Sequence, residues 1–155
     1  PAVSAAHCSR GVAFGDYDND GDLDILIVNL NEPPSLLRND LSGDHRWVKV
    51  QLIGSRSNRS AIGSTVKVRY GSRVQAQAMV AQSSFYSVSD RRLHFGLGQA
   101  SAVDIEVVWP NGVSQSHRRI ETNRLVVIRE DDTEAKVSRL EPGDAPASEG
   151  VSGSE

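Results

Sequence analysis

Apolar and polar residues alternate through most of the chain after residue 46, with the period of two that is typical of a β-strand with one buried face. In segment 47–52 the apolar residues take alternate positions and Lys49 and Gln51 lie between them, so the pattern predicts a half-buried strand. No stretch has the apolar spacing of a helix of two turns or more. The same alternation predicts further strands at 66–70, 74–80, 93–98, 103–109, 113–120 and 125–128.

Turn signals separate these strands at short intervals. Gly71-Ser72 predicts a two-residue hairpin turn, and Pro110-Asn111-Gly112 predicts the end of a strand. Short strands with such punctuation are typical of an all-β fold, and we predict a C-terminal β-sandwich over residues 45–130. Segment 131–155 is rich in serine, glycine, proline and acids and has few apolar residues, so we expect a disordered acidic tail.

Residues 1–44 form a separate predicted unit. Apolar residues predict short strands at 11–14, 24–29 and 35–39, and Pro33-Pro34 excludes a helix before the last of them. Turn-forming residues from Asn39 to Asp44 connect this unit to the sandwich. We therefore place the domain boundary at residue 44.

Five aspartates occupy every second position between the first two strands of this unit. They are Asp16, Asp18, Asp20, Asp22 and Asp24. Carboxylates this close repel one another unless a cation neutralises them, and hard oxygen ligands in a tight loop are typical of a Ca²⁺ site. Gly21 allows the sharp turn that such a loop needs. The pattern therefore predicts a calcium loop that leads into a strand.

The beginning of this loop matches an EF-hand loop, but its end does not. An EF-hand has a bidentate glutamate at its twelfth position, where this chain has Ile27. The alternative to a metal site is an acidic, solvated turn, although a turn needs only one or two such residues. The predicted Ca²⁺ ligands are the side chains of Asp16, Asp18, Asp20 and Asp24, with Asp22 contributing its backbone carbonyl.

Composition narrows the function classes. The net charge of −3 over 155 residues does not favour nucleic-acid binding, and no apolar run approaches the roughly 18 residues of a membrane span. The single cysteine, Cys8, has no second cysteine for an internal disulfide and no soft co-ligand for zinc. Because the chain begins at Pro1 without methionine, we expect a fragment of a longer protein; the oligomeric state is not predictable from these features.

Two parts of the chain resemble known families. Residues 12–25, in which Val-Ala-Phe-Gly leads into the aspartates, resemble an FG-GAP or VCBS-type repeat. Residues 47–128 resemble an ASPIC/UnbV domain, and a repeat followed by this domain is the order of the cartilage acidic protein-like family. The second resemblance is carried by segments 57–59, 61–63, 93–98, 107–112 and 122–124.

The resemblance implies more than the pattern does. FG-GAP repeats form blades of β-propellers and carry Ca²⁺ in this loop, so residues 1–44 are expected to be a terminal, partial blade. A propeller needs roughly four to eight blades, which implies a larger parent protein. The family context implies an extracellular, periplasmic or cell-surface location and a protein or glycan partner.

Two further groups are candidates for chemistry. His94 has Asp90 nearby in sequence, but neighbours along a strand point to opposite faces and a catalytic triad depends on geometry. We therefore favour a structural histidine in the sandwich and predict no enzyme. Phe85 and Tyr86 are adjacent aromatics on a loop and are candidates for ligand binding; the favoured alternative is that they cap the sandwich.

We thus predict a calcium-binding extracellular interaction or adhesion module in which the ion is structural. Two alternatives stay open: a biosynthetic enzyme or accessory protein of the UnbV type, and a carbohydrate-binding sandwich. An enzyme needs a cleft with convergent titratable groups, and the sequence shows no such set. A glycan-binding sandwich would depend on Phe85 or Tyr86.

Overall fold

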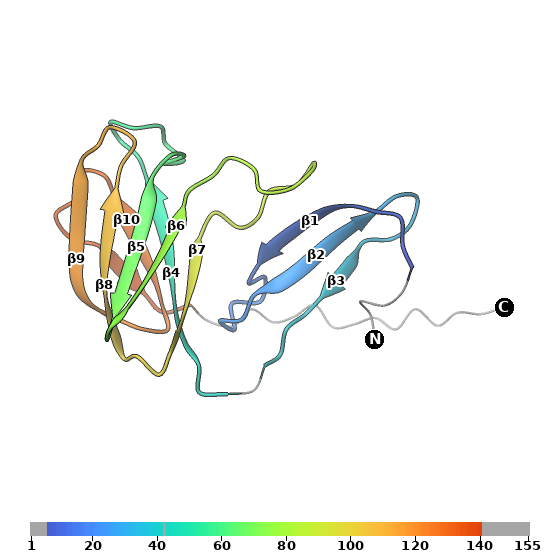
Figure 1. Cartoon of the computed structure of the whole chain (residues 1–155), viewed down its shortest axis with the longest axis horizontal. Helices are drawn as coiled ribbons and strands as arrows, with labels where there is room; N and C mark the ends of the chain where they lie inside the picture. The colour runs from blue at the N-terminus through green and yellow to red at the C-terminus, as the bar shows by residue number, and fades with distance from the viewer. Residues whose placement is uncertain (1–5, 42, 141–155) are drawn as a thin grey trace.

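The computed structural model describes residues 6–41 and 43–140. These residues form eleven strands in three sheets and no helix, which confirms the predicted all-β class. The described chain therefore has no helix long and apolar enough to span a membrane. Figure 1 shows one small sheet lying beside two larger ones.

The small sheet is antiparallel, with β1 (Ser9–Gly15), β2 (Asp24–Asn29) and β3 (Ser35–Leu37) in the order β1-β2-β3. Its strands match the predicted segments to within two residues at each end. The aspartate loop connects β1 to β2. A propeller blade has four strands, whereas this sheet has three among the described residues, so its identity as part of a blade stays a prediction.

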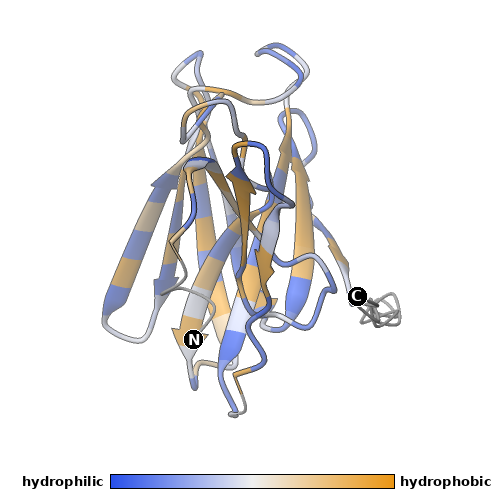
Figure 2. Cartoon of the chain, turned by 90° about the vertical axis from the view of Figure 1, so that its right-hand side faces the viewer, coloured by the Kyte–Doolittle hydropathy of each residue, from blue (hydrophilic) through white to orange (hydrophobic). Residues whose placement is uncertain are grey.

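The two larger sheets have four strands each, in the orders β11-β10-β4-β7 and β6-β5-β8-β9. Their apolar faces share one core, which is the arrangement of a β-sandwich. Figure 2 shows apolar residues running along the strands, while the loops are largely polar. The strands are β4 (Arg46–Ile53), β5 (Thr65–Tyr70), β6 (Arg73–Ala78), β7 (Leu93–Gly98), β8 (Ala102–Val108), β9 (Ser114–Glu121), β10 (Arg124–Arg129) and β11 (Lys136–Ser138).

The strand pairing around β4 differs from a simple meander. β4 pairs antiparallel with β7 on one side and parallel with β10 on the other, with Val50 opposite Val126. The outer edge of β10 pairs with β11. The prediction of disorder from residue 131 is therefore wrong at Lys136–Ser138, because an open strand edge offers backbone hydrogen bonds to a segment of any composition. Residues 141–155 of the predicted tail lie outside the described residues.

Hydrogen bonds join the small sheet to the loop that precedes β7. The hydroxyl of Ser87 donates to the carbonyl of Val12 at 2.7 Å, and the backbone N–H of Asp90 donates to the carbonyl of Phe14 at 2.8 Å. The N–H of Phe14 in turn donates to the hydroxyl of Ser89. This loop therefore runs along the edge of β1 and holds the aspartate loop against the sandwich.

At the far end of the sandwich, Glu130 organises the loop 54–60. One carboxylate oxygen accepts the backbone N–H groups of Ser55, Arg56 and Ser57 at 2.7–2.9 Å, and the other accepts the side chains of Ser57 and Asn111. Burial by itself would raise the pKa of Glu130. The hydrogen bonds from Ser57, Ser55 and Arg56 outweigh it and lower the pKa to about 2, from 4.5.

Replacing Glu130 by glutamine should destabilise the fold in a pH-dependent way. The folded pKa lies below the unfolded one, so the carboxylate stabilises the protein above pH 4.5, and this contribution is lost as the pH falls toward 2. Thermal melts should show Glu130→Gln several degrees below the wild type at pH 7, with the difference narrowing below pH 4.5. The exposed Glu134→Gln serves as control and should follow the wild type; a constant deficit at all pH values would contradict the assignment.

Candidate functional site

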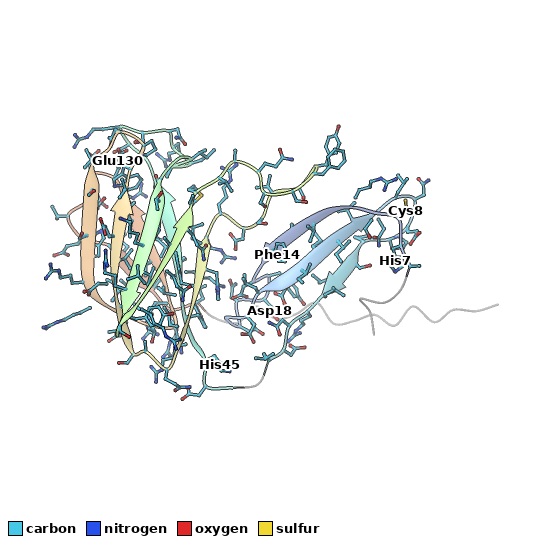
Figure 3. The ribbon with its side chains drawn as sticks, in the orientation of Figure 1. His7, Cys8, Phe14, Asp18, His45 and Glu130 are labelled. Carbon is cyan, nitrogen blue, oxygen red and sulfur yellow. The ribbon has the colours of Figure 1, made fainter. Side chains whose placement is uncertain are left out.

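The loop between β1 and β2 brings three of the five predicted ligands together. Asp16, Asp18 and Asp24 are all buried, and each offers a carboxylate oxygen such that these oxygens lie within 4.8 Å of one another. Asp18 is labelled in Figure 3, at the end of the small sheet that faces the sandwich. Three buried acids in one small volume can hold a metal ion.

Backbone hydrogen bonds to the carboxylates shape this loop. Asp24 accepts the N–H of Tyr17 on one oxygen and the N–H of Asn39, 2.8 Å away, on the other. Asp16 accepts the N–H of Gly21 at 2.8 Å through Oδ2. Asp24 therefore ties both the start of the loop and the segment after β3 to one point.

One oxygen of the cluster has no protein partner. Oδ1 of Asp16 is buried and makes no hydrogen bond among the described residues. A buried carboxylate oxygen without a donor is costly, because it has lost its water without a replacement. A cation bound between Asp16, Asp18 and Asp24 would satisfy this oxygen, so the residues present fit a metal ion.

The other two predicted ligands lie farther out. Asp20 is exposed and belongs to a second acidic group with Asp18 and Asp40, while the side chain of Asp22 belongs to neither group. Partial burial and the negative charges of Asp18 and Asp16 raise the pKa of Asp20, although its hydrogen bond from the Asp22 N–H opposes this. Ligation through the carbonyl of Asp22 stays a prediction.

A lysine from the sandwich forms the wall of the site. Lys49 of β4 is 1 % exposed, and its ammonium group contacts Oδ2 of Asp16 and lies 5.0 Å from the centre of the Trp47 ring. Burial lowers the pKa of Lys49, against the opposing effect of its hydrogen bond to Asp16. The prediction that Lys49 lies on the polar face of a half-buried strand is wrong, because the aspartate loop covers that face of β4.

Further contacts fasten the loop to the sandwich. The guanidinium group of Arg92 donates to the side-chain oxygen of Asn19 at 2.9 Å and to the carbonyl of Asp16. The side chain of Arg38 contacts Asp18 at 3.2 Å and the exposed Asp40. The sequence did not predict the contacts of these arginines, because charged residues at solvent-facing positions carry no signal about which distant segment they contact.

His94 has a positioning role. Its Nε2 lies 2.8 Å from the carbonyl oxygen of Gly21, and its ring stacks on Trp47. Burial lowers the pKa of His94, although the Gly21 carbonyl favours the protonated form. Asp90 pairs with Arg92 instead of the histidine. His94 therefore packs between the sandwich and the aspartate loop and forms no triad with Asp90.

Phe85 and Tyr86 lie far from the acidic cluster in the sequence and project into solvent. Their side chains are 60 % and 87 % exposed and contact each other edge to face. The favoured prediction that they cap the sandwich is therefore wrong. Ser87 anchors the loop that carries them to β1, and both rings lie in solvent instead of over the core. Ligand binding by this pair stays a prediction.

The fold and the site define an all-β protein in which an acidic loop packs against a β-sandwich. The chain belongs to the family described as ASPIC and UnbV, whose model matches residues 54–135. The ASPIC/UnbV part of the predicted resemblance is thus confirmed. The match begins after the aspartate loop and does not include the region that resembles an FG-GAP repeat.

Most of the chain is also similar to cartilage acidic protein 1. The similarity to the Homo sapiens protein is 30 % identity over 143 residues, which is 86 % of this chain and 21 % of that protein. The Mus musculus protein is 29 % identical over 139 residues, or 85 % of this chain and 21 % of the relative. The chain therefore spans about a fifth of the length of the curated relatives it matches.

Proposed function

We propose that the aspartate loop binds one Ca²⁺ ion with a structural role, and that the chain is an interaction module of a larger extracellular protein. The observation that carries the proposal is the buried group Asp16, Asp18 and Asp24, in which Oδ1 of Asp16 has no protein partner. The donors of this group are all carboxylate oxygens, which suit hard cations. Exposed Asp20 and water molecules could complete the six to eight oxygen ligands that Ca²⁺ takes.

The position of the site supports a structural role. Asp16 contacts Lys49, and the loop is held by His94 and Arg92; all three partners belong to the sandwich part of the chain. An ion at this point would fasten the small sheet to the sandwich. The proposed role is therefore to fix the relative position of two parts of the chain, with no catalytic step.

Two observations support the wider context of this proposal. The chain is similar to one fifth of a much longer relative, so further segments of the same protein are expected. One face of the small sheet also exposes apolar side chains, namely Leu26, Val28 and Leu36. We propose that this sheet is part of a propeller blade of the FG-GAP type. Calcium sites of extracellular modules have dissociation constants of about 10⁻⁴ to 10⁻³ M and fill outside the cell.

Calcium should raise the melting temperature of the chain. A site of that affinity at 10 mM Ca²⁺ stabilises the folded state by about 1–3 kcal/mol, which corresponds to several degrees. Asp18→Asn removes one charge from the cluster and keeps an oxygen for the weak contact from the Asp20 N–H. We expect this variant to lose most of the increase, measured by circular dichroism melts with Ca²⁺ and with EDTA.

The matched control is Asp44→Asn, which removes the same charge from an exposed aspartate outside both acidic groups. It should respond to Ca²⁺ as the wild type does. Calorimetric titration with Mg²⁺ in place of Ca²⁺ tests the identity of the ion. Two results would contradict the proposed site: a melting temperature that does not change at millimolar Ca²⁺, or an Asp18→Asn variant whose melting temperature rises with Ca²⁺ as much as that of the wild type.

A further inference from the structure

A second, chemically different hollow lies at the same end of the sandwich. It has a volume of about 640 Å³ and lies where the start of β4, the β9–β10 turn and the segment after β11 meet the aspartate loop. Polar groups dominate its lining, which includes Arg46, Trp47, Asn123, Arg124 and Arg139. None of these residues belongs to the acidic cluster.

One buried polar atom of the lining has no partner among the described residues, and it is an N–H donor. Nε of Arg46 is buried and makes no hydrogen bond among the described residues, and neither Arg46 nor Arg139 pairs with a carboxylate there. A buried guanidinium N–H without an acceptor is costly, so an acceptor beside Arg46 would stabilise this end of the sandwich.

The amides of the lining add to this pattern. The side-chain oxygen of Asn123 accepts the backbone N–H of Trp47 at 3.1 Å, which assigns the amide and leaves its NH₂ group for another acceptor. The side-chain oxygen of Asn19 accepts from Arg92 in the same way. Both asparagines line the hollow, so each can offer donors to a bound molecule.

The charged side chains of the lining, like its N–H donors, favour an anionic ligand. The lining contains three arginines, Arg46, Arg124 and Arg139, and two acids, Asp20 and Glu121. Arg124 pairs with Glu121 at 3.1 Å, which leaves Arg46 and Arg139 as the arginines of the lining that have no ion pair among the described residues. The planar guanidinium group of an arginine can donate two parallel hydrogen bonds to the oxygens of a carboxylate or sulfate group. Trp47 contributes an aromatic ring to the same lining.

We propose that this hollow binds the oxyanion of an acidic saccharide, a sulfate or carboxylate group held by Arg46 and Arg139, with the sugar beside Trp47 and the asparagine amides. The size of the hollow suits a ligand of one or two sugar rings, and its mixture of a ring with a few polar donors is typical of small-ligand sites. The hollow shares Asp20 with the second acidic group, but Arg46 and Arg139 play no part in the calcium proposal, so the two proposals can be tested separately.

Calorimetric titration of the full chain tests the proposal with three probes: a monosulfated disaccharide, its unsulfated counterpart and sodium sulfate. The sulfated disaccharide should bind at least about tenfold more tightly than either of the others, because only it combines the anion with the sugar. Arg46→Gln and Arg139→Gln should each weaken its binding by about tenfold or more. Arg139 is exposed, so Arg139→Gln tests the site even if Arg46→Gln impairs folding.

Control variants locate the binding site. Arg73→Gln removes an exposed arginine of β6 outside the hollow and should leave the affinity unchanged. Asp18→Asn should lose the calcium response but keep the disaccharide, so the two proposals fail separately. Equal affinity for sodium sulfate and the sulfated disaccharide would overturn the saccharide assignment. Loss of binding in Phe85→Ala with unchanged binding in Arg46→Gln and Arg139→Gln would overturn the site itself.

Discussion

Replacing Lys49 by methionine should lower the free energy of unfolding by about 3–5 kcal/mol in the absence of divalent metal. The ammonium group is the only side-chain cation within salt-bridge distance of Asp16 in the described chain, and both side chains are fully buried. Methionine keeps a long unbranched side chain, one heavy atom shorter than that of lysine, and removes the charge. The loss therefore measures mainly the cost of a buried carboxylate without a counter-ion. Urea denaturation in EDTA gives this free energy directly.

Calcium should offset much of this loss. A divalent ion at Asp16, Asp18 and Asp24 would supply the positive charge that Lys49→Met removes, and the variant should bind Ca²⁺ more tightly than the wild type because the repulsive ammonium is gone. The double variant Lys49→Met with Asp16→Asn, which removes both charges, should be more stable in EDTA than Lys49→Met alone. Equal stability of the single and double variants would show that the pair contributes no charge coupling.

Replacing Gly21 by alanine should have the second large effect. Gly21 has a φ of +105°, which a side chain disfavours, and a Cβ there would lie 1.8 Å from Nε1 of the Trp47 ring. The rigid indole cannot move away easily, because it stacks on His94 and lies 5.0 Å from the ammonium group of Lys49. We expect a loss of about 2–5 kcal/mol from backbone strain and overpacking together, measured by urea denaturation.

A second glycine substitution serves as control and separates the backbone strain at Gly21 from the contact with Trp47. Gly112 also has a positive φ, +84°, but a Cβ there meets no atom within 4 Å. Gly112→Ala should therefore show the backbone cost alone, about 1–3 kcal/mol, and keep the wild-type calcium affinity. Gly21→Ala should in addition weaken calcium binding, because the loop has to leave Trp47. Indistinguishable effects of the two substitutions would mean that the contact with Trp47 contributes nothing.

Local sequence patterns were sufficient to predict most of the strands. Period-two alternation and turn residues place β5 and β6 on either side of Gly71-Ser72, and the structure pairs them as a hairpin in that register. The sequence did not predict β11, because its residues are all exposed and show no alternation of buried and exposed positions. A strand held mainly by backbone hydrogen bonds to an edge leaves little trace in the side chains.

The acidic cluster itself was visible in the sequence, since alternate aspartates in a short loop are informative without any tertiary contact. Which aspartates lie together was only partly visible: Asp16, Asp18 and Asp24 converge, whereas Asp20 groups with Asp18 and Asp40, and Asp22 belongs to neither group. The residues that surround the cluster were not predictable. Lys49, His94 and Arg92 come from strands and loops more than 20 residues away, where a polar residue between apolar ones normally faces water.

By itself, then, the sequence determined the all-β class, the positions of most strands and the acidic character of one loop, because these depend on the order of neighbouring residues. Only the tertiary structure decided that the loop lies against β4, that Lys49 is buried beside Asp16, and that arginines gather at the end of the sandwich. The physical reason is that burial and counter-charge are set by whichever distant segment covers a side chain. That choice belongs to the packing of the whole chain.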